Sequence, residues 1–181
     1  MLIDRDGVVN DDGGDFVRSA SEFVPIPGSL EAIARLNAAG LSVALVTNQS
    51  GIARGYLDLK ILDSIHAAMA EALGCVGGHV DRIFVCPHGP EDGCGCRKPA
   101  PGLILEAMSE FGIGAGETIF IGDRRSDLEA AQTATCHAML TRTGRGEEFV
   151  DYANERGLPV VADLSGAVDA LLDLRSDGSP S

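Results

Sequence analysis

The sequence lacks any long hydrophobic run, so nothing in it predicts a membrane span. No segment approaches the roughly 18 uninterrupted apolar residues that a membrane-spanning helix needs. Asp4 and Arg5 also interrupt the start of the chain, where a signal peptide would need a hydrophobic stretch. We therefore expect a cytoplasmic protein.

Basic residues are scarce as well. The 181 residues include 14 Lys and Arg against 27 Asp and Glu, which gives a formal net charge of -13. Such a chain repels nucleic acids and anionic membranes, so we predict neither as a partner. The same charge repels phosphate esters. A phosphate site in this chain would therefore need a divalent cation, local basic side chains or helix N-termini.

Cysteines are few, odd in number and unevenly spaced, a pattern unlike a secreted disulfide framework. There are five, and Cys86, Cys94 and Cys96 fall within eleven positions. With His88 they place three thiols and an imidazole on a short loop rich in Gly and Pro, a donor set that suits tetrahedral zinc. We predict a structural zinc ion on Cys86, His88, Cys94 and Cys96, which would orient the basic pair that follows.

Short apolar runs bounded by turn residues predict buried strands, and helical patterns lie between them. The predicted strands are Leu2-Ile3, 41–46, 82–86, 118–121, 138–140 and 159–161. The predicted helices are 29–39, with Ser29 as N-cap, 57–73, 102–111, 126–134 and 164–174.

This alternation predicts an α/β fold, a Rossmann-like doubly wound parallel sheet with helices on both faces. Ligands of such sheets bind at the carboxyl ends of the strands. The length suits one domain, which we place at residues 1–175, followed by a frayed tail over 176–181. Only short segments follow Gly7 and Ile52, so we predict no separate cap domain. We also expect a monomer.

Two aspartates follow the first predicted strand. Asp4 and Asp6 are two residues apart, so strand alternation would point both to one side and Arg5 to the other. Two carboxylates in one pocket need a cation or unequal pKa values. We predict that Asp4 attacks phosphorus as the nucleophile and that Asp6 acts as general acid and base. An isolated Asp-x-Asp pair is more often a solvated turn, so the prediction depends on partners elsewhere.

Polar groups follow three further strands. Thr47 offers a hydroxyl and neighbouring backbone N–H groups that can bind phosphoryl oxygens. Arg97 and Lys98 are cations that can neutralise charge on a transferring phosphoryl group.

The third group is a carboxylate, Asp123, after the strand predicted over 118–121. It is placed to complete an oxygen-rich Mg²⁺ site with Asp4 and the backbone carbonyl of Asp6. Asp127 would support that site from further out.

In this order, these groups resemble the four motifs of phosphatases of the haloacid dehalogenase superfamily, over about residues 1–145. The resemblance implies a Rossmann-like fold, a required Mg²⁺ and the roles just given to Asp4, Asp6, Thr47, Lys98 and Asp123. The Cys-x-His and Cys-x-Cys pairs before Arg-Lys-Pro are similar to the branch that dephosphorylates heptose bisphosphates or histidinol phosphate.

Within that branch, the stretch 47–55 is similar to enzymes that remove the 7-phosphate of D-glycero-D-manno-heptose 1,7-bisphosphate, as is 142–146. Arg124 departs from the lysine usual there and is closer to the histidinol phosphate enzymes, so that substrate stays the alternative. The resemblance also implies a set of substrate contacts, namely Asp12, Asp15, Asn48, Gln49, Ser50, Arg97 and Arg124.

A phospho-accepting receiver domain is a competing class, because it is also doubly wound and combines acidic residues with Mg²⁺. Its phosphorylated Asp normally follows a central strand, whereas Asp4 follows the first, and it needs no zinc loop. The order of the motifs therefore favours the phosphatase.

Overall fold

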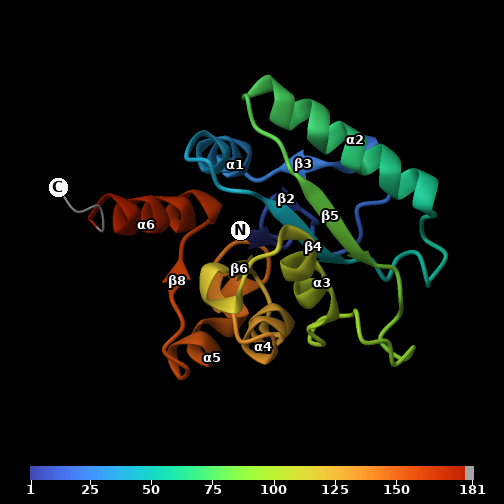
Figure 1. Cartoon of the computed structure of the whole chain (residues 1–181). Coiled ribbons are helices and arrows are strands. Elements are labelled where there is room, and N and C mark those ends of the chain that lie inside the picture. Colours follow the sequence, from blue (N-terminus) through green and yellow to red (C-terminus); the bar gives the residue numbers. More distant parts are fainter. Residues whose placement is uncertain (178–181) are drawn as a thin grey trace.

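A computed structural model of the protein describes residues 1–177. Its centre is a six-stranded sheet in the order β5-β4-β1-β6-β7-β8 (Figure 1). All neighbours in it are parallel. The strands are β1 (Leu2–Ile3), β4 (Ala44–Asn48), β5 (Arg82–Cys86), β6 (Ile119–Gly122), β7 (His137–Thr141) and β8 (Val160–Val161). The order switches sides at β1, and the carboxyl ends of strands at such a switch form a ligand-binding crevice.

Helices cover both faces of the sheet. The α-helices in residues 1–177 are α1 (Ser29–Ala38), α2 (Leu59–Cys75), α3 (Gly102–Phe111), α4 (Arg125–Thr133), α5 (Val150–Asn154) and α6 (Leu164–Asp177). Short 3-10 helices span Ala20–Glu22, Ala115–Glu117 and Gly146–Phe149. Figure 1 shows α1, α2 and α6 on one side of the sheet and α3, α4 and α5 on the other. The predicted fold class is confirmed.

Alternate strand residues build the two halves of the core. Ile3 and Leu45 pack in the cluster that includes α1, α2 and α6, whereas Leu2 and Val46 pack in the cluster that includes α3, α4 and α5. Strands buried on both faces need apolar residues at every position. This is why they appear in the sequence as continuous hydrophobic runs.

The strand predicted over 41–46 is displaced to Ala44–Asn48 in the structure. Contacts with distant parts of the chain set where this strand begins. β4 starts where Ala44 pairs with Leu2 of the short β1, while the backbone N–H of Val43 donates to the Asp81 side chain at 2.8 Å.

The predicted N-cap of α1 is wrong. Gly28 occupies the N-cap position with φ 83°, a left-handed conformation that suits glycine. The Ser29 hydroxyl instead donates to the carbonyl oxygen of Val9 at 2.6 Å. That bond ties the start of α1 to the segment that follows β1.

The segment between β1 and α1 contains a small antiparallel sheet of β2 (Asn10–Asp11) and β3 (Val24–Pro25). No separate cap domain is present within residues 1–177, as predicted. α6 includes residues 176 and 177 of the predicted tail, and the rest of that tail lies outside the described residues. None of the described helices is long and apolar enough to cross a membrane.

Candidate active site

Side chains from three different segments meet around Lys98. Asp4 follows β1, Asp127 lies in the first turn of α4, and both are buried. Lys98 Nζ lies 2.9 Å from Asp4 Oδ2 and 2.8 Å from Asp127 Oδ1. It also donates to the carbonyl oxygen of Val46 at 2.8 Å. These contacts hold the ammonium group at the carboxyl ends of the central strands.

The buried carboxylates form a donor set that fits a divalent cation. Oxygens of Asp4, Asp123 and Asp127 all lie within 4.8 Å of one another. Asp123 Oδ1 is buried and accepts no hydrogen bond. Burial, together with the neighbouring acidic groups, raises the pKa of Asp4 to about 8 and the pKa of Asp123 to about 7. Hard oxygen donors with unneutralised charge are what Mg²⁺ binds in proteins.

The backbone closes tightly around Asp123. A Cβ atom at Gly7 would lie 2.2 Å from Asp123 Oδ2, and one at Gly144 would lie 2.3 Å from the same oxygen. Both glycines have positive φ. The backbone N–H of Arg145 donates to Asp123 Oδ2 at 2.9 Å. Only residues without side chains allow these two loops to approach the carboxylate so closely.

Asp6 lies in a different electrostatic environment. Arg5 donates to Oδ1 from Nε at 3.0 Å and from Nη2 at 2.8 Å, and Nη2 also lies 2.9 Å from Oδ2. Asn10 and Gln49 donate to the same carboxylate at 3.0 and 2.7 Å. Burial alone would raise the pKa of Asp6, but the Arg5 charge and these hydrogen bonds outweigh it, and the pKa is lowered.

Two expectations about this pair need correction. The pKa values of Asp4 and Asp6 are unequal, as predicted. However, Asp6, the expected proton donor, is the carboxylate with the lowered pKa, and Asp4, the expected nucleophile, has the raised pKa. A cation bound beside Asp4 would lower the pKa of Asp4. Arg5 does not point away: it is fully buried and folds back onto Asp6. β1 ends at Ile3, so strand alternation does not extend through these positions.

Side chains at and just after the end of β4 form hydrogen bonds with the predicted catalytic residues. Thr47 is buried, and its hydroxyl accepts from Gln49 Nε2 at 2.9 Å. Asn48 accepts from the backbone N–H of Lys98 at 3.1 Å and donates to the carbonyl oxygen of Lys98 at 3.0 Å. The side-chain amides of Asn48 and Gln49 are therefore both bonded to other protein groups.

One cavity of about 620 Å³ joins these groups. Its lining includes three of the predicted catalytic residues, Asp4, Asp6 and Lys98, together with Asp127. It also includes all the predicted substrate contacts: Asp12, Asp15, Asn48, Gln49, Ser50, Arg97 and Arg124. Thr47 and Asp123 are buried and do not line it.

Ion pairs occupy part of the cavity rim. Arg124 Nη2 lies 3.2 Å from Asp12 Oδ2, and Arg18 Nη2 lies 2.6 Å from Asp15 Oδ2. Phe16 and Val17 supply an apolar part of the wall.

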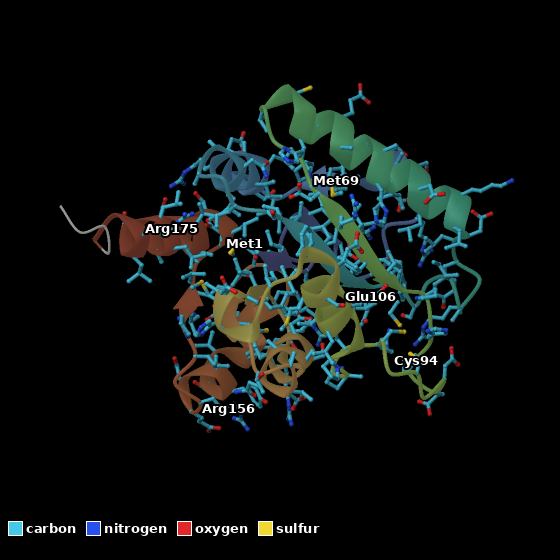
Figure 2. All side chains as sticks on the ribbon, viewed as in Figure 1. Met1, Met69, Cys94, Glu106, Arg156 and Arg175 are labelled. Atoms are coloured by element: carbon cyan, nitrogen blue, oxygen red, sulfur yellow. The ribbon has the colours of Figure 1, made fainter. Side chains whose placement is uncertain are left out.

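The four predicted zinc ligands come together beside this cavity. Sγ of Cys96 lies 3.2 Å from Sγ of Cys86, 3.4 Å from Sγ of Cys94 and 3.2 Å from Nδ1 of His88. Cys86 ends β5, and Figure 2 shows Cys94 on the loop that leads from β5 to α3. The cluster could hold a metal ion.

Known proteins resemble the chain over nearly its whole length. A family model described as HAD-hydrolase-like matches residues 95–167. The D-glycero-β-D-manno-heptose-1,7-bisphosphate 7-phosphatase of Pseudomonas aeruginosa is 45% identical over 172 residues, which cover 95% of this chain and 97% of that protein. The chain belongs to this heptose-bisphosphatase family. The Bordetella bronchiseptica member is 44% identical over 173 residues, covering 95% of this chain and 97% of that one.

Solved structures of the heptose-bisphosphatase family share the fold. The B. bronchiseptica D,D-heptose 1,7-bisphosphate phosphatase, complexed with magnesium and phosphate, matches with a TM-score of 0.92 and 44% identity, covering 96% of this chain and 97% of that one. The Burkholderia thailandensis enzyme matches with a TM-score of 0.73 and 34% identity, covering 94% and 96%. These matches confirm the superfamily and the branch predicted from the motifs, and they leave no support for a receiver domain.

Sequence reasoning missed several residues that shape the site of this family member. Arg5 and Asn10 hold Asp6, and the backbone of Arg145 holds Asp123. Asp127 contacts Lys98 directly, although we expected it further out. The sequence contained one indication of these contacts. Arg5 is a charged residue between two aspartates next to an apolar strand, and a buried charge must be paired.

Proposed function

We propose that this protein is a Mg²⁺-dependent phosphatase that removes the 7-phosphate of D-glycero-β-D-manno-heptose 1,7-bisphosphate through an aspartyl-phosphate on Asp4. The observation that carries the proposal is the buried Asp4 carboxylate, which lines the cavity and lies 2.9 Å from Lys98 Nζ. The names and high identity of the relatives support the substrate, and the bound magnesium and phosphate of the B. bronchiseptica enzyme support the reaction.

In the first half-reaction, an Asp4 oxygen attacks phosphorus and the bond from phosphorus to the sugar oxygen breaks. Asp6 gives a proton to the departing oxygen. Because Arg5 holds Asp6 as an anion in the free protein, Asp6 must take up this proton when the negatively charged substrate binds beside it and raises its pKa. In the second half-reaction, Asp6 takes a proton from water, which attacks the phosphorus of the aspartyl-phosphate and regenerates Asp4. Inorganic phosphate and heptose 1-phosphate leave.

Lys98 and Thr47 would stabilise the transferring phosphoryl group, Lys98 by its charge and Thr47 through its hydroxyl and the adjoining backbone N–H groups. Asp4, Asp123 and the backbone carbonyl of Asp6 would hold Mg²⁺, with Asp127 beside them. The bound ion would supply positive charge to the phosphoryl oxygens and to the buried carboxylates.

For the sugar, we propose contacts with Ser50, Arg97, Arg124, Asp12 and Asp15, which all line the cavity. Asn48 and Gln49 line it too, but their amides bond to Lys98 and Asp6, so we assign them chiefly to holding those residues.

For the loop, we propose a structural zinc ion on Cys86, His88, Cys94 and Cys96. Zn–S bonds of about 2.3 Å in a tetrahedron put the sulfurs roughly 3.8 Å apart. The observed separations of 3.2 to 3.7 Å between the three Sγ atoms are close to that value. The cytoplasmic location, monomeric state and single domain over 1–175 stay predictions.

The deciding experiment compares kcat/KM for heptose 1,7-bisphosphate, as separate β and α anomers, with kcat/KM for histidinol phosphate, with and without Mg²⁺. We expect Mg²⁺-dependent release of the 7-phosphate and a large preference for the β anomer, because kcat/KM reports differential binding of the transition states. A preference for histidinol phosphate would overturn the substrate. No phosphate release from any ester would overturn the reaction.

A further inference from the structure

A fully buried arginine lies directly behind the proposed acid and base. The Arg5 side chain has 0% exposure, and Asp6, which has 20%, lies between it and the cavity. Burying a guanidinium group is strongly unfavourable unless its N–H groups are paired. Here Nε and Nη2 both donate to Asp6, so the fork of the guanidinium faces the carboxylate edge-on.

The remaining nitrogen of Arg5 contacts a second element. Nη1 lies 3.3 Å from Nε2 of His66, which belongs to α2. Burial and the Arg5 charge lower the pKa of His66 to about 4, so the ring is neutral at pH 7. A neutral imidazole with its proton on Nδ1 accepts at Nε2. His66 is therefore the acceptor for one of the two N–H groups of Nη1, the Arg5 nitrogen that Asp6 does not contact.

This chain of contacts fixes an orientation as well as a charge. A bidentate pair between a guanidinium and a carboxylate defines the plane of the carboxylate, which a lysine ammonium cannot do. The His66 contact in turn limits rotation of the guanidinium. Small displacements of a proton-transfer group lower rates strongly, because transfer requires hydrogen-bonding distance to the reacting oxygen.

We propose that Arg5 and His66 are positioning residues for Asp6: His66 on α2 holds Arg5, and Arg5 aims the Asp6 carboxylate into the cavity. The inference rests on the proposed function, since it assigns a role to the surroundings of the proposed acid and base. It extends the active site to a residue of a helix on the face of the sheet.

Proton transfer from Asp6 to the departing oxygen matters only when that oxygen is a poor leaving group. An alkyl phosphate such as a sugar 7-phosphate needs the proton, whereas p-nitrophenyl phosphate releases a stable phenolate without it. The parameter kcat/KM covers steps up to the first irreversible one, so for both substrates it excludes hydrolysis of the aspartyl-phosphate. The ratio of the two kcat/KM values therefore isolates the acid role of Asp6.

The test compares His66→Phe, which keeps a planar ring but removes the acceptor, with His66→Gln, which supplies an amide oxygen. We expect His66→Phe to lower kcat/KM for heptose 1,7-bisphosphate about tenfold and to change that for p-nitrophenyl phosphate less than about twofold. His66→Gln should restore most of the loss. His79→Gln is the matched control, because the His79 side chain is 63% exposed and its ring pairs with the surface residue Asp81, away from Arg5.

Arg5→Lys is the second variant, and we expect a larger loss, about a hundredfold, on the sugar phosphate alone. Thermal unfolding identifies variants that fold. Equal losses on both substrates in folded variants, or no loss in either variant, would overturn the inference. If His66→Phe does not fold, Arg5→Lys decides. Absence of phosphatase activity in the unmodified protein is a different result, because it overturns the proposed function itself.

Discussion

At the scale of single residues, negative charge is concentrated in a buried cluster of three carboxylates at the proposed active site. Asp4 and Asp127 share the buried ammonium group of Lys98, and Asp123 lies beside them with its Oδ1 3.8 Å from Arg124 Nε. Such a cluster is unfavourable for folding unless further positive charge is bound. The same surplus of negative charge would attract a divalent cation, whose charge would in turn attract a phosphoryl group.

The proposed nucleophile gives the first prediction. Asp4→Asn keeps the side-chain volume but removes the attacking oxygen anion, so we expect phosphate release to fall roughly a thousandfold or more while the fold persists. Phosphate release and thermal unfolding measure the two effects. Asp151→Asn, an exposed site in α5, is the control. Near-normal turnover by Asp4→Asn would contradict the assignment.

The two hydrogen bonds between the Asn48 side chain and the backbone of Lys98 give the second prediction. In Asn48→Asp, the oxygen that replaces Nδ2 would face the carbonyl oxygen of Lys98, so the backbone of Lys98 must shift. We expect kcat to fall about tenfold or more with little change in KM, because Lys98 acts mainly on the transition state. Asn154→Asp makes the same charge change at an exposed site. A rise in KM alone would instead indicate that Asn48 binds substrate.

At the scale of elements, the loop from β5 to α3 carries both the proposed zinc ligands and Lys98. Cys86 fixes one end in the sheet, and the backbone of Gly102 at the start of α3 donates to the carbonyl oxygen of Gly95 at 3.1 Å. A metal ion bound to the loop would therefore set the position of Lys98 without contacting substrate.

The loop gives the third prediction. Protein purified without chelator should contain about one zinc per chain by elemental analysis. Cys94→Ser should lose the metal, unfold at a lower temperature and lose activity, since the loop that presents Lys98 is loosened. Cys75→Ser, at an exposed free cysteine, should keep all three properties. Full zinc content in Cys94→Ser, or none in the unmodified protein, would rule out the site.

At the scale of the whole molecule, the buried carboxylates couple stability to pH. Between pH 7 and 8 the folded chain holds protons on Asp4 and Asp123, whose pKa values are about 8 and about 7, whereas the unfolded chain does not. Stability falls with pH where the folded state binds more protons. His66, with a pKa of about 4 in the folded state, is neutral there, and in the unfolded chain, where its pKa is about 6.5, it is mostly neutral in this window.

We therefore predict that, in Mg²⁺-free buffer, Asp4 and Asp123 contribute a decrease of about 1 kcal/mol in the free energy of unfolding from pH 7 to pH 8. The Met1 amino group and the Cys94 thiol, whose pKa values are lowered on folding, contribute in the opposite direction. Mg²⁺ binds the ionised carboxylates of the folded state, so it should stabilise the protein more at pH 8 than at pH 7. Denaturant unfolding at the two pH values measures both effects. Relative to the Asp4→Asn variant, the unmodified protein should lose stability from pH 7 to pH 8 without Mg²⁺, and identical pH dependences of the two proteins would contradict the prediction.

The sequence by itself determined the fold class and the position of the catalytic candidates. Strand β5 and helix α3 have the predicted bounds, because buried strands and amphipathic helices leave distinct periodicities. Polar residues directly after such strands must meet at one edge of a parallel sheet, so Asp4, Lys98 and Asp123 could be grouped from their order alone. The cysteine spacing likewise grouped Cys86, His88, Cys94 and Cys96, which the structure brings together.

Only the tertiary structure decided how these side chains are oriented. The two-residue β1 pairs on both sides and ends before Asp4, which frees Arg5 to fold back onto Asp6. Asn48 bonds to a residue 50 positions away, and His66 reaches Arg5 from 61 positions away. Hydrogen bonds between residues so distant depend on how helices and loops pack against the sheet, and no local pattern in the sequence encodes that packing.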